Sequence, residues 1–324
     1  VILISIDDTE CSNLILICNE IFGASNFVAN VSWQRTYSPR NDSKGIVSEV
    51  EHLVVFSKNP GWQPNKLPRT EAMDSRYKNP DNDVAPWKSS DAFAPGAATH
   101  QGMVYAIQHP FTGEMLYPSN GRCWRYQQSS MLEYMQGWRN YRLENLHDEK
   151  ERARVCGIDE SAVRKDVLAI VLEEPLEVSA AKAQKVYNRG RWPGFYFTKG
   201  GYGGIARKTY LENVGGRLPT NLWMYEETGH TDEAKKELIS LFGGRSPFDT
   251  PKPTRLLDFV LKVAGTSETL MLDSFAGSGT TAHAVLNANK ADNGNRHFIL
   301  IEMMDYADSI TAERVKRVIK GYGE

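Results

Sequence analysis

The feature that most constrains the fold lies near the C-terminus, at residues 270–285. It reads LMLDSFAGSGTTAHAV: an apolar run ending at Asp273, a glycine loop and an Ala-rich segment. Gly277 and Gly279 lack a Cβ atom, so the turn can adopt unusual backbone angles and a ligand can approach the backbone closely. Free N–H groups at a helix start can receive electronegative ligand atoms. The stretch therefore predicts a strand, a ligand-binding turn and a helix.

A second apolar run, at residues 297–302, ends at Glu302. This spacing suits a βαβ unit whose second acid reaches ribose hydroxyls. A phosphate-cradling loop of the Walker type would need Lys after Gly279, and a dinucleotide loop would have Gly where this chain has Ala282. The carboxylate of Asp273 would repel a pyrophosphate, but it can pair with a ligand ammonium group.

A ligand with an ammonium group, a ribose and a base is S-adenosyl-L-methionine, which we predict as the cofactor. For Asp273 taken alone, a glycine-rich turn with a capping aspartate is the alternative. Asp273, Phe275, the two glycines and Glu302 together favour the cofactor site.

Composition narrows the class of protein. The chain has 324 residues, which suggests about two domains. Its net charge is −2, so nucleic-acid binding would depend on local patches. No apolar run approaches the roughly 20 residues of a membrane span. The four cysteines form no CxxC pair and no histidine has metal-ligand spacing, so we expect no metal site and a reducing, cytoplasmic location.

The order of elements predicts an α/β sheet split by a long insertion. Residues 1–6 read as a strand, Asp7 or Asp8 as the cap of a helix that ends at Gly23, and residues 37–45 as a polar loop. Further strands are expected at 27–33, 52–57, 269–273 and 297–302. Helices are expected at 142–171, 232–242, 256–263, 280–290 and 308–320.

A basic and aromatic segment lies within the insertion. Residues 182–217 contain eight Lys or Arg and one acid, Glu212, with aromatic residues interleaved. Such a segment can hold phosphates and stack bases. The DNA-binding candidates are Arg189, Arg191, Lys199, Arg207 and Lys208. The alternative is a solvated basic face beside a small aromatic core.

Several segments in order resemble the β class of DNA amino-methyltransferases. They are Ile4–Glu10, Gly121–Tyr126, Asn221–Trp223, Glu227–His230, Phe248–Arg255 and the glycine loop. The likeness is closest to the modification (Mod) subunit of type III restriction–modification systems. It implies a Rossmann-like S-adenosylmethionine-dependent methyltransferase sheet, circularly permuted, with a large inserted target-recognition domain. The catalytic half would be residues 1–59, the recognition domain 60–231 and the cofactor half 232–324.

The resemblance also implies roles for individual residues. The methionine part of the cofactor would be held by Asp273, Phe275, Gly277, Gly279 and Thr280. Glu302 would bind the ribose, Asp7 would lie at the pocket edge, and Thr250, Lys252 and Pro253 would line the methionyl end. The implied reaction is methylation of adenine N6 in duplex DNA by a homodimer that pairs with a restriction (Res) subunit. Cytosine N4 and RNA remain alternative targets.

One departure from the family concerns catalysis. The family's catalytic tetrapeptide is Asp-Pro-Pro-Tyr, and no Pro-Pro pair occurs in this sequence. The tetrapeptide is expected upstream of Val1, so the catalytic residues are unknown and the chain is expected to be truncated at its N-terminus. We therefore predict that these residues are inactive alone. A non-enzymatic module that binds DNA or cofactor is the alternative.

Overall fold

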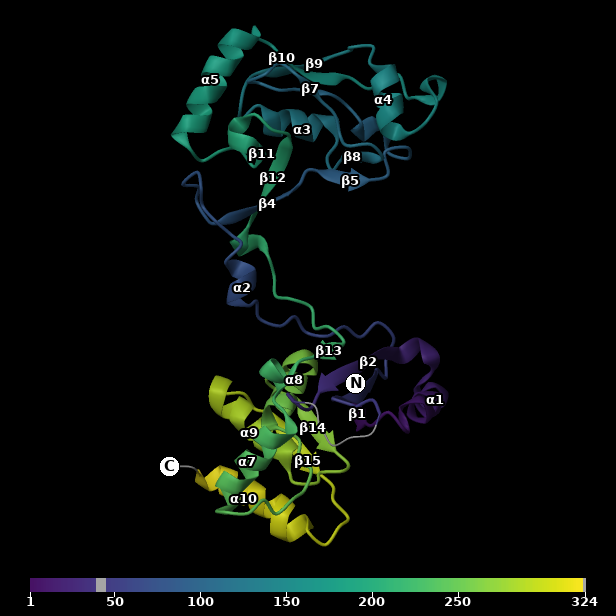
Figure 1. Cartoon of the computed structure of the whole chain (residues 1–324), viewed down its shortest axis with the longest axis vertical. Helices are drawn as coiled ribbons and strands as arrows, with labels where there is room; N and C mark the ends of the chain where they lie inside the picture. The colour runs from purple at the N-terminus through teal and green to yellow at the C-terminus, as the bar shows by residue number, and fades with distance from the viewer. Residues whose placement is uncertain (39–44, 323–324) are drawn as a thin grey trace. The chain divides into compact units, whose positions relative to one another are not determined.

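The computed structural model describes residues 1–38 and 45–322, and it divides the chain into two compact units. One unit comprises Val1–Pro68 and Gly216–Glu324, and the other comprises Arg69–Gly215 (Figure 1). The architecture is mixed α/β with several small sheets. Part of the predicted loop at 37–45 lies outside the described residues.

The first unit contains a four-stranded sheet in the order β1-β3-β2-β13. Its strands are β1 (Ile2–Ile6), β2 (Phe27–Gln34), β3 (Val50–Phe56) and β13 (Leu222–Trp223). Strand β3 runs antiparallel to β1 and β2, whereas β13 is parallel to β2. The apolar side chains of β3 alternate between two faces, because successive residues of a strand point in opposite directions.

Each face of this sheet is covered by a helix. Val54 and Phe56 pack with Cys11 and Cys18 of α1 (Cys11–Phe22). Leu53 and Val55 pack on the other face, in a cluster that includes Phe259 and Val260 of α8 (Thr254–Ala264). The predicted capping of α1 was wrong, because the helix begins at Cys11 with Glu10 at its N-cap and no side-chain cap. Gly23 ends the helix, as predicted.

A two-stranded parallel sheet carries the glycine loop. Strands β14 (Leu270–Asp273) and β15 (His297–Leu300) pair in register and are joined by α9 (Thr280–Asp292). Helices α7 (Thr231–Phe242), α8, α9 and α10 (Glu313–Lys320) gather beside this pair (Figure 1). A π-helix, Ala307–Ala312, leads into α10, and α6 (Tyr225–Thr228) precedes α7.

The two sheets of this unit share α8. Leu256 of α8 belongs to the core of the four-stranded sheet, and Met271 of β14 packs against the same cluster. Leu261 of α8 packs with Ala284 and Val285 of α9. One helix therefore contributes to the core beneath both sheets.

The second unit is built around an aromatic core. Its buried members include Trp87, Trp124, Trp138, Tyr105 and Phe197. Three small sheets surround this core, in the orders β7-β6-β10-β9, β11-β12-β4 and β5-β8. The strands are β4 (Trp87–Asp91), β5 (Phe93–Pro95), β6 (Ile107–Gln108), β7 (Met115–Leu116), β8 (Arg122–Trp124), β9 (Tyr141–Glu144), β10 (Ala169–Leu172), β11 (Phe195–Phe197) and β12 (Ile205–Tyr210). The helices are α2 (Glu71–Asp74), α3 (Gln128–Met135), α4 (Glu149–Cys156) and α5 (Leu176–Arg189).

The predicted helix at 142–171 was largely wrong. Only α4 is α-helical there, and the segment begins in β9 and ends in β10, which pair antiparallel. The charged residues of this segment suit a helix locally, but the pairing joins residues about 30 positions apart, as in Tyr141 with Leu172. All four cysteines are free and buried. Among the described residues, no helix is both long enough and apolar enough to cross a membrane.

Candidate functional site

The glycine loop joins the end of β14 to the start of α9, as the sequence predicted. Gly277 and Gly279 have φ angles of +52° and +77°, in the left-handed region that only glycine enters without strain. A Cβ on Gly279 would lie 3.0 Å from the carbonyl oxygen of Thr311. The Thr311 hydroxyl donates to the Gly277 carbonyl at 2.6 Å. The loop is therefore held against the helical segment that follows β15.

Asp273 lies at the carboxyl end of β14, where the chain turns into the loop. Its Oδ1 accepts the backbone N–H of Phe275 at 3.1 Å, and its Oδ2 accepts the Thr281 hydroxyl at 2.6 Å. The carboxylate thus receives one donor from the loop and one from the first turn of α9. These bonds fix its direction at the strand end while the side chain stays partly exposed.

Glu302 lies just beyond the end of β15, beside the same loop. Its Oε2 accepts the backbone N–H of Gly277 at 2.8 Å, and its Oε1 accepts that of Met304 at 3.0 Å. These backbone hydrogen bonds, Met304 first and then Gly277, lower the pKa of Glu302 from its ordinary value. Because the ends of adjacent parallel strands meet at one sheet edge, both acids flank the loop.

Aromatic side chains lie around the loop. Phe275 is 87% exposed, so its ring is available to a ligand. The Phe248 ring lies 3.4 Å from the position that a Cβ on Gly277 would occupy. It also packs edge-to-face on Tyr306, with ring centroids 5.3 Å apart.

The segment that includes Thr250, Lys252 and Pro253 meets the loop through its backbone. The Thr280 hydroxyl donates to the Lys252 carbonyl at 3.1 Å. The Lys252 ammonium pairs with Glu51 of β3 at 2.6 Å and lies 5.5 Å from the centroid of the Trp33 ring. Pro253 is buried and Thr250 is exposed. Lys252 therefore connects the segment of residues 250–253 to the four-stranded sheet.

The two acids that follow β1 form hydrogen bonds with residues outside the glycine loop. Asp8 bonds His52 at 2.8 Å and Ser48 at 3.0 Å, and these hydrogen bonds lower the pKa of Asp8. Asp7 is exposed and accepts the backbone N–H of Thr9 at 3.0 Å. Within the described ranges, no hydrogen bond joins Asp7 to the glycine loop.

A buried arginine that sequence reasoning missed lies against this loop. The Arg314 side chain has no exposed surface, and it bonds the hydroxyls of Ser278 and Thr280 at 3.1 and 2.9 Å. A sequence signal existed: Thr311, Arg314 and Val318 share one face of a helix by their spacing, and the flanking members of that set are weakly polar or apolar. An arginine on such a face needs buried partners.

The candidate DNA-binding residues of the second unit fall into three environments. Arg189, Arg191 and Lys199 are exposed, and Arg207 is half-buried on β12. Lys208 is fully buried, and its ammonium bonds Asp81, Asp83 and the carbonyl of Trp192. That ammonium is enclosed by its own acids, so we withdraw Lys208 as a phosphate contact.

The aromatic residues of the same segment also differ in their burial. Phe195, Tyr196 and Phe197 are buried in the core of the unit, which is what the alternative interpretation expected of them. Tyr202, in the glycine-rich loop, is 63% exposed and remains available for stacking.

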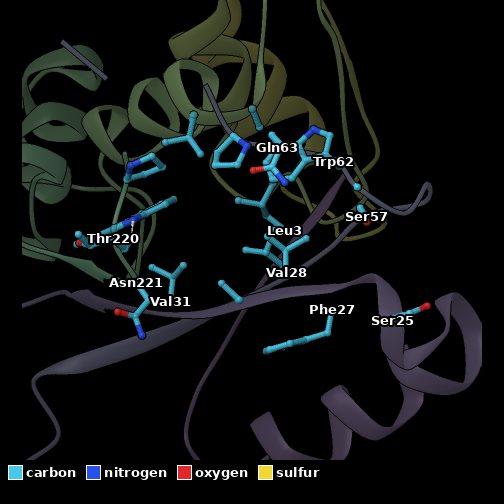
Figure 2. A pocket seen from close by; sticks show the side chains of 18 residues that line it. Leu3, Ser25, Phe27, Val28, Val31, Ser57, Trp62, Gln63, Thr220 and Asn221 are labelled. Carbon is cyan, nitrogen blue, oxygen red and sulfur yellow. Dashed lines mark hydrogen bonds between the residues drawn. The ribbon is translucent and has the colours of Figure 1, made fainter. Parts of the chain in front are cut away.

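The first unit also contains an apolar pocket of about 430 Å³, shown in Figure 2. It is lined by Leu3, Val28 and Val31, by Trp62 and Gln63, and by the C-terminal end of α8. These lining positions include the start of β2 and the end of β3. None of the predicted cofactor residues lines this pocket.

Fold and site together define an α/β protein whose glycine loop is flanked by two acids at the ends of adjacent parallel strands. The chain belongs to the DNA methylase family, whose model matches residues 1–313. This match and the relatives below confirm the predicted resemblance to type III Mod subunits.

The chain is similar to type III modification subunits and to a type II methyltransferase. The chain is 29% identical to the type III restriction–modification enzyme StyLTI Mod subunit of Salmonella typhimurium, over 98% of this chain and 42% of that protein. It is 26% identical to the EcoPI Mod subunit of Escherichia phage P1, over 93% and 42% of the two chains. It is 26% identical to the type II methyltransferase M.KpnI of Klebsiella pneumoniae, over 93% and 62%. The chain thus spans less than half the length of the type III relatives.

Proposed function

We propose that this chain carries the cofactor site and the recognition region of an S-adenosylmethionine-dependent DNA adenine-N6 methyltransferase of a type III restriction–modification system. The observation that carries the proposal is the pair of acids, Asp273 and Glu302, fixed by hydrogen bonds on either side of a glycine loop in a DNA methylase. The names of the Mod-subunit relatives support the type III assignment.

The chemistry of these residues fits the cofactor. The Asp273 carboxylate suits its ammonium group, and the Glu302 carboxylate suits the ribose hydroxyls. The glycines and Thr280 would let the backbone approach the methionine part, beside the exposed ring of Phe275. Thr250, Lys252 and Pro253 would line the methionyl end, and Asp7 would lie at the pocket edge. When bound, the cofactor supplies the methyl group as a sulfonium.

We infer further that the two sheets of the first unit belong to one permuted, Rossmann-like sheet. Among the described residues, β14 pairs with β15 alone and β1 with β3 alone, which leaves one free edge on each. Leu270, Leu272 and Ile299 are 60%, 57% and 47% exposed. A strand carrying Asp-Pro-Pro-Tyr would pair with both edges and its flanking chain would cover these side chains.

That strand would also supply the catalytic groups. Its acid and backbone would accept hydrogen bonds from the target amine, and its aromatic ring would stack on the flipped base. Extruding a base costs a few kcal/mol and needs a pocket to receive it. The resulting proposal is that these 324 residues bind cofactor but do not methylate DNA alone.

DNA recognition is assigned to residues 60–231. Arg189, Arg191 and Lys199 are exposed and Arg207 half-exposed, so their cations can meet backbone phosphates, and the exposed ring of Tyr202 can stack on a base. We also propose a homodimer that pairs with a Res subunit in the cytoplasm, which is what the resemblance to type III Mod subunits implies.

The test of the cofactor site is calorimetry with S-adenosylmethionine on the wild-type chain and on Asp273→Ala. We expect binding by the wild type and a loss of about tenfold or more in the variant, the loss typical of one charge-assisted hydrogen bond. Equal affinities would remove the role of Asp273. Competition with duplex DNA and structured RNA would then identify the nucleic acid.

A further inference from the structure

The buried guanidinium of Arg314 links the two walls of the proposed cofactor site. One wall is the glycine loop, and the other is the segment of residues 250–254. Arg314 of α10 donates through Nη1 to the hydroxyls of Ser278 and Thr280, at 3.1 and 2.9 Å. The Ser278 carbonyl lies 3.5 Å from the same nitrogen. Ser278 lies between the two glycines with left-handed backbone angles, and Thr280 begins α9. Arg314 therefore holds the loop at Ser278, where the two neighbouring glycines allow the backbone the most freedom.

The second terminal nitrogen of the guanidinium, Nη2, faces residues of α7, α8 and α9. Nη2 donates to Glu237 of α7 at 2.9 Å, to the Thr254 hydroxyl at 3.2 Å and to Nδ1 of His283 at 3.1 Å. Thr254 directly follows the segment of Thr250, Lys252 and Pro253, and its hydroxyl also donates to Glu237. Glu237 balances the charge of the arginine.

These contacts form a closed path between the walls. Thr280 accepts a bond from Arg314 and donates one to the Lys252 carbonyl at 3.1 Å, while Thr254 accepts from the same guanidinium. The separation between the loop and the Lys252 segment is thus set by the planar guanidinium together with the direct bond from Thr280 to the Lys252 carbonyl. A planar fork of fixed donors can hold several acceptors at once, which a lysine ammonium on a flexible stem cannot reproduce.

We propose that Arg314 is a positioning residue that sets the spacing of the two walls around the methionyl part of S-adenosylmethionine. This inference rests on the proposed function of the site. It assigns Arg314 to the amino-acid end of the cofactor and not to the nucleoside end, since the proposed ribose-binding acid Glu302 bonds Gly277 and Met304, and within the described residues no hydrogen bond joins it to Arg314.

The test uses two ligands that differ only at the amino-acid end. S-adenosylhomocysteine has both the nucleoside and the amino-acid part, whereas 5′-methylthioadenosine lacks the amino acid. Calorimetry on Arg314→Lys is expected to give an S-adenosylhomocysteine Kd raised about tenfold, the effect of one charge-assisted hydrogen bond, with the methylthioadenosine Kd unchanged. Equal weakening of both ligands would mean a general loss of structure and would overturn the proposal.

A control and a second variant keep the test decisive. Arg317, on the same helix, pairs with Glu313 at 2.7 Å and donates to the Leu241 carbonyl, so Arg317→Lys should leave both affinities unchanged. Should Arg314→Lys fail to fold, Ser278→Ala removes an acceptor of the guanidinium and leaves its pair with Glu237. It should weaken S-adenosylhomocysteine alone, by about threefold, because the guanidinium loses one of its several acceptors and keeps the others.

The outcomes also separate this inference from the function on which it rests. If the wild type binds neither ligand, the proposed cofactor site is wrong. If the wild type binds both and Asp273→Ala loses S-adenosylhomocysteine while Arg314→Lys and Ser278→Ala keep it, the site stands and the role of Arg314 is refuted.

Discussion

Two lysines of the basic segment have the same chemistry and opposite environments. Lys199 is exposed, whereas the Lys208 ammonium is enclosed by Asp81, Asp83 and the Trp192 carbonyl. Removing one partner of a buried ion pair leaves uncompensated charge, which destabilises a protein by about 3–5 kcal/mol. A lysine at the surface has its ammonium group available to a phosphate. Position in the fold therefore decides which of the two lysines can contact a nucleic acid.

This contrast gives a paired prediction. We expect Lys208→Met to lower the free energy of unfolding by about 3 kcal/mol or more, because Asp81 and Asp83 lose their counter-charge. Lys199→Met should leave stability unchanged and reduce the salt dependence of duplex-DNA binding by about one phosphate contact. Urea denaturation and binding at several salt concentrations measure the two effects. Equal stability losses in both variants would contradict the environments described.

A second residue-scale prediction concerns pH. Burial, with the charge of Arg314, lowers the pKa of His283 from 6.5 to about 3. An unfolded chain takes up this proton below pH 6.5 and the folded chain does not. The contribution of His283 to stability is therefore fully present above pH 6.5 and falls by about 1.4 kcal/mol for each unit of pH below it, toward pH 3. His283→Gln should flatten this decline.

Urea denaturation between pH 7 and pH 4 measures the slope, which is informative even if the substitution lowers stability at every pH. The exposed residue His297 provides the control, because His297→Gln should keep the wild-type slope. Identical slopes for all three proteins would show that His283 titrates normally.

At the scale of elements, two glycines have the same backbone angle but differ in the space around them. Gly279 and Gly243 both have φ of +77°. A Cβ on Gly243 meets nothing within 4 Å, whereas one on Gly279 lies 3.0 Å from the Thr311 carbonyl oxygen. The left-handed conformation costs an alanine about 1–2 kcal/mol at either position.

We therefore predict that Gly279→Ala and Gly243→Ala both lower the melting temperature, and that Gly279→Ala alone weakens S-adenosylmethionine binding. The added methyl group must displace the loop from Thr311, and with it the N–H of Gly277 that bonds Glu302. Thermal unfolding and calorimetry check the two parts. Normal cofactor affinity in Gly279→Ala would show that the loop is not the binding element.

Element prediction from this sequence succeeded where the signal was local. The strand, loop and helix around Gly277 follow from an apolar run, two glycines and an Ala-rich stretch within 16 residues. The helix at 142–171 failed because β9 pairs with β10 across a span that local propensity does not report. Arg314 was missed for a related reason: its partners on α7, α8 and α9 are distant in sequence.

At the scale of the whole molecule, the open edges of β1 and β14 motivate the last prediction. Within the part of the chain that the structure describes, each has a strand on one side alone. Exposed apolar strands with free backbone groups are sites of further pairing. Leu270, Leu272 and Ile299 lie exposed on the β14–β15 pair, so a strand and its flanking chain would bury apolar surface there.

We expect these 324 residues to bind S-adenosylmethionine without methylating duplex DNA, and a longer polypeptide, extended by a strand with Asp-Pro-Pro-Tyr, to methylate it. Hydrogen exchange supplies an independent readout: the β14 amides that face away from β15 should exchange quickly in the shorter chain and become protected in the longer one, because the added strand would pair with them. Transfer of a labelled methyl group measures turnover. Methylation by the shorter chain would mean that the target amine finds its acceptors among the residues present, and the proposed strand between β1 and β14 would then have no catalytic role.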